Sequence, residues 1–332
     1  MSGRVRPREG RAPSRGARVA GRIALRLGGA VFVLWAVVTI TFFAIRLVPG
    51  DPALAILGGP GSQASAEALA LVRAEYGLDR PLFEQYLAAL GRLLSGDLGT
   101  SYALRTPVAE VIGAQIGGTL LLAVLALAVA WLIALALSLW STRGDRFSAA
   151  VGGAIETVAA ALPHFWLAAV LIVVFSTWLG WLPPVSTGTA AGLVLPVLTL
   201  AIPVAGFLAQ VMRESMLEAL ASPFAVSARA RGESPSGLRL RHVVRHAAIP
   251  GVNLSAWAFG YLIGGAVVVE TIFARPGLGR SLVQAVVVRD VPLVTGVVIV
   301  TALAYIVVTI VADLLSLAID PRLRGEPTGA AA

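Results

Sequence analysis

Six apolar stretches, each long enough to cross a membrane as a helix, constrain this chain more than any other feature. A hydrocarbon core of about 30 Å needs roughly 20 apolar residues in helical form. Of the 332 residues, 57% are hydrophobic and only 13% are charged, whereas a soluble domain carries about 25% charge. The sequence therefore predicts an all-α, polytopic membrane protein with six transmembrane helices. They are expected at residues 27–48, 117–140, 162–182, 191–212, 248–270 and 291–319.

The third stretch is the least regular of the six. Apolar residues continue over 149–182, and Pro163 interrupts them. Proline removes a backbone donor and breaks or kinks a helix. We therefore expect residues 162–182 to cross the membrane, preceded by a helical segment that carries Glu156 close to the membrane surface.

The distribution of arginine predicts the orientation. No lysine is present, so all 26 basic residues are arginine, and 17 of them lie in residues 1–26, 143–146, 229–245 and 320–332. Only 7 lie in the segments on the other side of the six stretches. Because cytoplasmic loops collect basic residues, we expect a transmembrane domain over 27–319 with both tails in the cytoplasm. Residues 1–26, rich in arginine, proline and glycine, are expected to be disordered.

The longest polar segment, residues 49–116, is expected on the outer side and contains two predicted helices. Ser65 is a favoured N-cap and Gly77 a favoured stop for the first helix. Pro81 favours the start of the second helix, which is expected to end near Gly96. Its apolar residues at 83, 86, 87, 90 and 94 form one stripe. The stripe indicates either packing on the helix bundle or a docking surface for an external partner.

Two missing residue types exclude several kinds of chemistry. Without cysteine there is no disulfide, thiolate metal site or cysteine nucleophile. Without lysine there is neither a Walker A loop nor a Schiff base. His242 and His246 have the spacing of a metal pair, but arginines surround them and no carboxylate is near. We expect a chain that is not an enzyme, with no catalytic residue, no cofactor, no metal and no nucleic-acid partner.

The loop at residues 217–247, expected in the cytoplasm, contains a predicted short helix. Ser222 can cap it, Pro223 suits its first turn, and Gly232 can end it in a left-handed conformation. Small residues between them would let another surface approach closely, and these are Ala225, Ser227, Ala228 and Ala230. The segment is either an ordinary positively charged loop or a docking helix.

A series of short segments resembles the membrane-spanning permease subunits of bacterial ABC importers of the dipeptide, oligopeptide and nickel class. The resemblance covers nearly the whole chain after about residue 22. Its main segments are Val48-Pro49-Gly50-Asp51-Pro52, Tyr76-Gly77-Leu78-Asp79-Arg80-Pro81, Gly96-Asp97-Leu98-Gly99, Leu162-Pro163-His164-Phe165-Trp166-Leu167, Ala228-Arg229-Ala230-Arg231-Gly232, Glu270-Thr271-Ile272-Phe273-Ala274-Arg275-Pro276-Gly277-Leu278-Gly279 and Asp320-Pro321-Arg322-Leu323-Arg324.

The resemblance implies a type I importer-like architecture in the bacterial cytoplasmic membrane. This chain would form half of a translocation pathway for peptides or similar small solutes that a solute-binding protein delivers. A second homologous permease subunit would form the other half, and two ATPase subunits would bind ATP and Mg. The implied ATPase-coupling loop contains Phe224, Ser227, Ala228, Arg229, Ala230, Arg231 and Gly232. External docking or gating candidates are Asp51, Glu270, Pro276, Gly277 and Gly279.

Two features favour the first-permease type of this class. Val226-Ser227-Ala228 stands where the general coupling motif has Glu-Ala-Ala, and the external segment is long. The alternative function is that of a secondary transporter or channel that works alone. Such a protein would need matching inverted repeats or paired carboxylates in the middle of the membrane. An intramembrane enzyme, a further alternative, would need a catalytic group at membrane depth.

Overall fold

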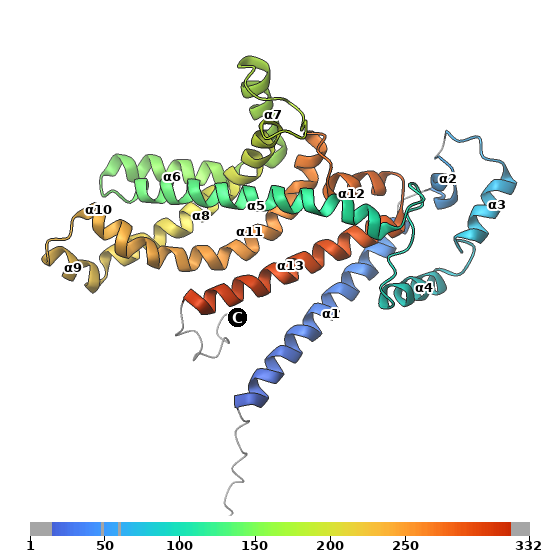
Figure 1. Cartoon of the computed structure of the whole chain (residues 1–332), viewed down its shortest axis with the longest axis horizontal. Coiled ribbons are helices and arrows are strands. Elements are labelled where there is room, and N and C mark those ends of the chain that lie inside the picture. Colours follow the sequence, from blue (N-terminus) through green and yellow to red (C-terminus); the bar gives the residue numbers. More distant parts are fainter. Residues whose placement is uncertain (1–14, 48–49, 59–60, 320–332) are drawn as a thin grey trace, which may run out of the picture.

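The computed structural model describes residues 15–47, 50–58 and 61–319, and within these ranges every regular element is a helix. Four helices, α5 (Val108–Ser141), α6 (Arg146–Ala161), α8 (Ala191–Ala221) and α11 (Val244–Ile272), lie along the long axis of the molecule (Figure 1). Helices α1 (Arg15–Leu47) and α13 (Val291–Ile319) contact each other on one flank of this bundle. The predicted all-α architecture is confirmed.

Among the described residues, five continuous helical segments are long and apolar enough to cross a membrane. They are Gly28–Leu47, Val108–Ser141, Ala191–Ala221, Pro235–Ile272 and Val291–Val311. A bent pair, Arg146–Ala161 and His164–Trp178, passes the same test if it is counted as one crossing. With this pair, the number of crossings agrees with the six that the sequence predicts.

The third crossing differs from the sequence prediction. Helix α7 (His164–Leu171) continues into a π-helical turn, η1 (Ile172–Trp178), and this unit meets α6 at 106° on either side of Pro163. The predicted break at Pro163 is therefore confirmed, but the helical unit after it ends at Trp178 and does not reach residue 182. Helix α6 packs along α5 and α8, whereas α7 takes another direction after the bend and contacts α8 and α11 (Figure 1). Glu156 is buried between α5 and α6, where it accepts a hydrogen bond of 2.8 Å from Ser141 Oγ.

Several helices extend beyond the apolar stretches. Helix α1 begins at Arg15, so residues 15–26, expected to be disordered, are helical. Helix α5 begins at Val108 rather than near residue 117, and α8 continues to Ala221. The extensions contain polar residues, whose backbone groups still hydrogen-bond within the helix. The remainder of the first tail, residues 1–14, and the last tail, residues 320–332, lie outside the described residues.

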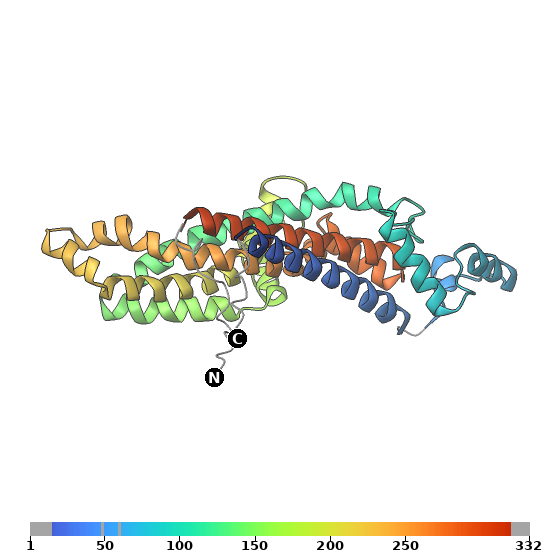
Figure 2. The ribbon, with the colours of Figure 1, turned by 90° about the horizontal axis from the view of Figure 1, so that it is seen from below.

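The external segment forms three short helices at one end of the molecule, opposite α9 (Pro223–Ala230) and α10 (Pro235–Leu238) (Figures 1 and 2). These are α2 (Pro52–Ile56), α3 (Ala66–Glu75) and α4 (Leu82–Leu94). Ser65 caps α3 by accepting a hydrogen bond from the Ala68 N–H, which confirms the predicted start. The two predicted helices correspond to α3 and α4, and α2, which Asp51 caps, is an additional helix that was not predicted.

Helix α8 lies at the centre of the bundle, between α5, α6 and α11. Its partner α5 presents a buried row of small residues to the core, namely Ala123, Ala126, Ala130 and Ala134. Small side chains allow helix backbones to approach closely in a membrane, where packing and not water exclusion holds helices together. Pro196 and Pro203 lie inside α8 and are tolerated because neighbouring helices surround it.

Close contact between α8 and α6 predicts that Gly206→Ala destabilises the bundle. A Cβ atom on Gly206 would overlap the Ala160 backbone nitrogen and lie 2.7 Å from the Glu156 carbonyl oxygen. Backbone cannot move as a flexible side chain can, so we expect a loss of about 1–3 kcal/mol. Gly113→Ala is the matched control, since a Cβ there meets nothing within 4 Å. Thermal unfolding in detergent measures the stability of both variants. Equal unfolding midpoints for Gly206→Ala and Gly113→Ala would contradict this packing argument.

Candidate functional site

Helix α9 projects at the end of the molecule where α8 ends and α11 begins (Figures 1 and 2). The predicted short helix is confirmed, and Pro223 lies in its first turn. Ser222 precedes it, but its hydroxyl donates a 2.6 Å hydrogen bond to the Ala219 carbonyl oxygen of α8 and does not cap α9, which corrects that prediction. Gly232 follows the helix with φ of +85°, the left-handed conformation that the sequence predicts. A side chain at this φ would be strained, so glycine allows the chain to turn back toward α11.

The two faces of α9 have different roles. Ala225 and Ala228 are buried against the same chain, with exposed fractions of 0% and 4%. Val226, Ser227 and Ala230 are exposed on the opposite face. All four small residues were expected on one approach surface, and the structure corrects this for Ala225 and Ala228. They bring α9 close to its own bundle, and only the other face is free to meet a partner.

Side-chain contacts fix α9 to the ends of the long helices. The Phe224 ring stacks on His246 of α11, with centroids 4.9 Å apart. Arg229 donates a 2.8 Å hydrogen bond to the Leu220 carbonyl oxygen of α8. Both residues were expected to contact an ATPase, and here they connect α9 to two helices that run through the bundle. A force on the exposed face of α9 would therefore be transmitted to α8 and α11.

The chain after α9 is also anchored. Ser234 caps α10 by accepting a 3.1 Å hydrogen bond from the Gly237 N–H. Arg239 donates a 3.2 Å hydrogen bond to the Thr142 carbonyl oxygen just after α5. Arg231 and Gly232 remain exposed. The whole segment from α9 to α11 is thus a braced structure and not a loose loop.

At the opposite end, Asp51 has a structural role. Its carboxylate caps α2 by accepting from the Ala53 N–H, and it pairs with Arg73 of α3 at 2.6 Å. Partial burial raises the pKa of Asp51, but the hydrogen bonds from Arg73 and Ala53 and the charge of Arg73 outweigh this. The net pKa is below the usual value. Asp51 therefore connects α2 and α3 as a carboxylate at neutral pH.

The other external candidates form one buried joint between α5, α11 and α12 (Leu278–Val287). Glu270, with 0% exposure, accepts hydrogen bonds from Thr119 Oγ1 at 2.6 Å and from the Gly279 N–H at 2.8 Å. A third comes from the Arg280 N–H at 3.2 Å. The carboxylate therefore sits at the N-terminus of α12, where unpaired N–H groups and the helix dipole favour negative charge.

Glycine is required on both sides of this carboxylate. A Cβ on Gly277 would overlap the Glu270 carboxylate, and one on Gly279 would lie 2.5 Å from the Val267 Cα atom. Pro276 precedes them and continues the turn from α11 to α12. The structure thus brings together Glu270, Pro276, Gly277 and Gly279, whereas Asp51 lies elsewhere in the external segment.

Asp290 is a buried residue that the sequence reasoning missed. Its carboxylate accepts from Ser101 Oγ, from the Ala103 N–H at 3.1 Å and from the Leu293 N–H at 3.2 Å. It joins the start of α13 to the loop before α5. The available signal was an aspartate two residues before a proline at the start of an apolar run, which is a helix-start pattern.

Comparison of the sequence with protein families assigns this architecture. Residues 134–325 match the family described as the binding-protein-dependent transport system inner membrane component, and residues 22–123 match the N-terminal component of such membrane proteins.

The chain belongs to this family of permeases.

The permease is similar to glutathione transport system permease proteins. It is 37% identical over 303 residues to GsiC of Salmonella choleraesuis (strain SC-B67), covering 90% of this chain and 97% of that one. It is 36% identical over 304 residues to GsiC of Escherichia coli (strain K12), with the same coverage. These matches confirm the resemblance to the dipeptide and oligopeptide class.

A solved methionine ABC transporter, MetNI, has a similar fold. In two inward-facing crystal forms its chain gives TM-scores of 0.52 and 0.54 at 17% identity, covering 64% of the permease and 97% of the solved chain. The family match and the GsiC relatives, not this fold similarity, make the permease a multi-pass subunit of a binding-protein-dependent ABC importer in the bacterial inner membrane. It is a transport subunit and not an enzyme, and a transporter that works alone is not favoured.

Proposed function

We propose that the permease forms half of a pathway for peptide-like solutes, with a second homologous permease as the other half. The similarity to glutathione permeases supports a small peptide as the solute class. A solute-binding protein would deliver the solute at the end that carries α2 to α4. Two ATPase subunits would bind ATP and Mg and act on α9.

The observation that carries the proposal is the construction of α9. Its exposed face presents Val226, Ser227 and Ala230, while Phe224 and Arg229 attach it to α8 and α11. Without lysine the chain has no P-loop, so the free energy of ATP hydrolysis must arrive through a contact with another subunit. A short helix with small exposed side chains, braced on two membrane helices, suits that contact.

Uptake in cells tests the proposed function. We expect a strain that lacks this permease to lose ATP-dependent uptake of labelled glutathione or dipeptides, and a plasmid copy to restore it. A binding assay on the purified solute-binding protein that delivers solute to this permease would identify the solute. Uptake that continues after the ATPase subunits are deleted would refute an ATP-driven importer, whatever the solute.

The proposed orientation places α9 and both tails in the cytoplasm, and cysteine labelling tests it. Helix α1 starts and α13 ends toward the end that carries α9, away from α2 to α4 (Figure 1). The chain has no cysteine of its own. In spheroplasts we expect Gly61→Cys to react with an impermeant maleimide and Ser236→Cys to react only after the membrane is opened. The reverse pattern would invert the orientation.

A further inference from the structure

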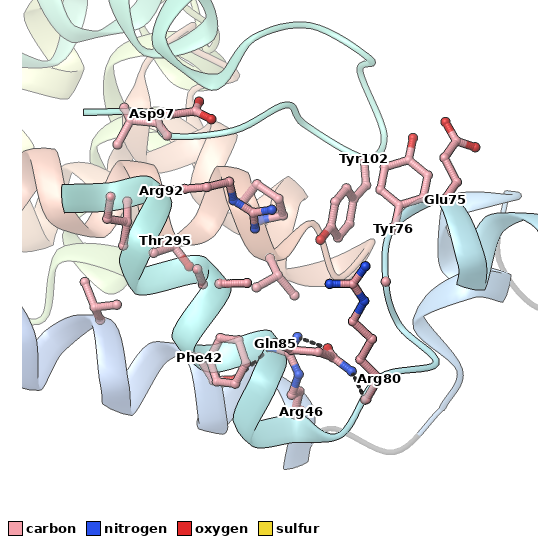
Figure 3. A pocket seen from close by; sticks show the side chains of 18 of the residues that line it. Phe42, Arg46, Glu75, Tyr76, Arg80, Gln85, Arg92, Asp97, Tyr102 and Thr295 are labelled. Carbon is pink, nitrogen blue, oxygen red and sulfur yellow. Dashed lines mark hydrogen bonds between the residues drawn. The ribbon is translucent and has the colours of Figure 1, made fainter. Parts of the chain in front are cut away.

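A cavity of about 200 Å³ lies between the outer half of α1, helices α3 and α4, and the start of α13. Figure 3 shows three arginines around it, Arg46 from α1, Arg80 before α4 and Arg92 on α4. We call it the outer arginine cavity and define it by these three residues and Tyr102. The transport role described above does not use it.

In the part of the chain that the structure describes, the arginines of this cavity have no acidic partner. Arg46 donates to Gln85 Oε1 at 2.7 Å and to the Phe42 carbonyl oxygen at 3.3 Å, and its guanidinium lies 3.6 Å from the Phe42 ring centroid. Among the described residues, Arg80 and Arg92 form neither an ion pair nor a side-chain hydrogen bond. Three positive charges thus face one cavity with their donor capacity largely unused.

The two acidic residues on the wall do not neutralise these charges. Asp97 accepts a 2.8 Å hydrogen bond from the Gly99 N–H. In Figure 3 the carboxylates of Asp97 and Glu75 point away from the centre, while Arg80 and Arg92 lie on either side of the Tyr102 hydroxyl. An anion bound between the guanidinium groups would receive charge-assisted hydrogen bonds, which are about twice as strong as neutral ones.

The position of the cavity indicates where such an anion comes from. Arg46 is next to the last residue of the apolar segment Gly28–Leu47, so the cavity lies at the level where the membrane core ends. On α4, Tyr86 packs against Phe42, but Phe83, Leu87 and Leu94 are 66%, 49% and 89% exposed. An amphipathic helix with an arginine, Arg92, on one side and exposed apolar residues on the other is typical of a membrane surface.

We propose that the outer arginine cavity binds the phosphate of an anionic phospholipid. Its acyl chains would lie along α1 and the exposed apolar residues of α4. Phosphate matches the planar donor groups of arginine, and tyrosines such as Tyr76 and Tyr102 suit the interface between water and lipid. The bound lipid would hold the external helices against the membrane. This inference requires a membrane-spanning chain but no particular solute.

Native mass spectrometry of the full chain in mild detergent tests the proposal with dioleoyl-phosphatidylglycerol and dioleoyl-phosphatidylcholine. We expect tighter binding of phosphatidylglycerol. Each arginine near a membrane surface raises the affinity for an anionic lipid about fivefold. Arg92→Gln should therefore weaken binding about fivefold, and the double variant Arg80→Gln with Arg92→Gln about 25-fold. Arg105→Gln removes an equal charge from the same external segment, outside the cavity, and should leave binding unchanged. Because Arg80 and Arg92 make no side-chain hydrogen bond, their loss should not unfold the chain.

The outcomes separate a lipid from other anions. Equal binding of phosphatidylglycerol to the wild type and the double variant would overturn the proposal, as would equal binding of the two lipids. Inorganic phosphate and the dipeptide Gly-Asp serve as soluble probes in a thermal-shift assay. If either protects the wild type but not the double variant, while phosphatidylglycerol protects neither, the cavity is a site for a soluble anion and the lipid proposal fails.

Discussion

Ala230→Trp should leave the permease folded in the membrane but remove most of its ATPase partner and its transport activity. Ala230 is on the exposed face of α9 and contributes nothing to the buried core of its own chain. A large side chain there would hold a docked subunit away from the helix. Loss of a central interface contact costs about 2 kcal/mol or more, which corresponds to roughly 30-fold weaker binding.

Two variants make this result specific to the exposed face of α9. Ala70→Trp introduces the same bulk at an exposed position of α3, at the other end of the molecule, and should retain the ATPase. Ala228→Trp is expected to behave differently from Ala230→Trp, because Ala228 is 4% exposed and its replacement should lower the unfolding temperature. Co-purification, uptake and thermal unfolding measure the three effects. Normal ATPase retention in Ala230→Trp would show that α9 does not dock through this face.

Glu270→Ala should destabilise the permease more than any other single carboxylate change that we propose. It leaves three donors without their acceptor, namely Thr119 Oγ1 and the N–H groups of Gly279 and Arg280. Each buried donor left unpaired costs about 1–3 kcal/mol, so a loss of about 3–5 kcal/mol is expected. Glu270→Gln keeps one oxygen acceptor but loses the charge at the N-terminus of α12, and should lose roughly 1–2 kcal/mol.

Thermal unfolding of the purified chain measures the contribution of the Glu270 joint. Glu110→Ala, which removes an exposed carboxylate from the first turn of α5, should change the midpoint little. Thr119→Val should reproduce part of the Glu270 effect, because Thr119 also accepts a 2.9 Å hydrogen bond from the Leu278 N–H. If Glu270→Ala and Glu110→Ala unfold at the same temperature, the joint does not stabilise the fold.

Much of the candidate site could be predicted from the sequence where local chemistry decides the conformation. Ser65 caps α3, Pro223 starts α9, and Gly232 adopts a positive φ, as each residue type favours. The contact partners of these elements could not be predicted in the same way. Phe224 and Arg229 were assigned to an external contact, yet they hold α9 to its own bundle. Their partners lie on other helices, and a single sequence does not encode which helices become neighbours.

The sequence by itself determined the five helices that can each cross the membrane, because an apolar run must be long enough to cross the hydrocarbon core, and it located the sixth apolar stretch that forms the bent pair. It also determined the family, through motifs spread over the chain. Only the tertiary structure decided the 106° bend at Pro163, the inward face of Ala228 and the burial of Glu270. The physical reason is that a uniformly apolar helix has no polar face to fix its rotation. Packing between helices, with small residues and buried hydrogen bonds at the contacts, supplies that information.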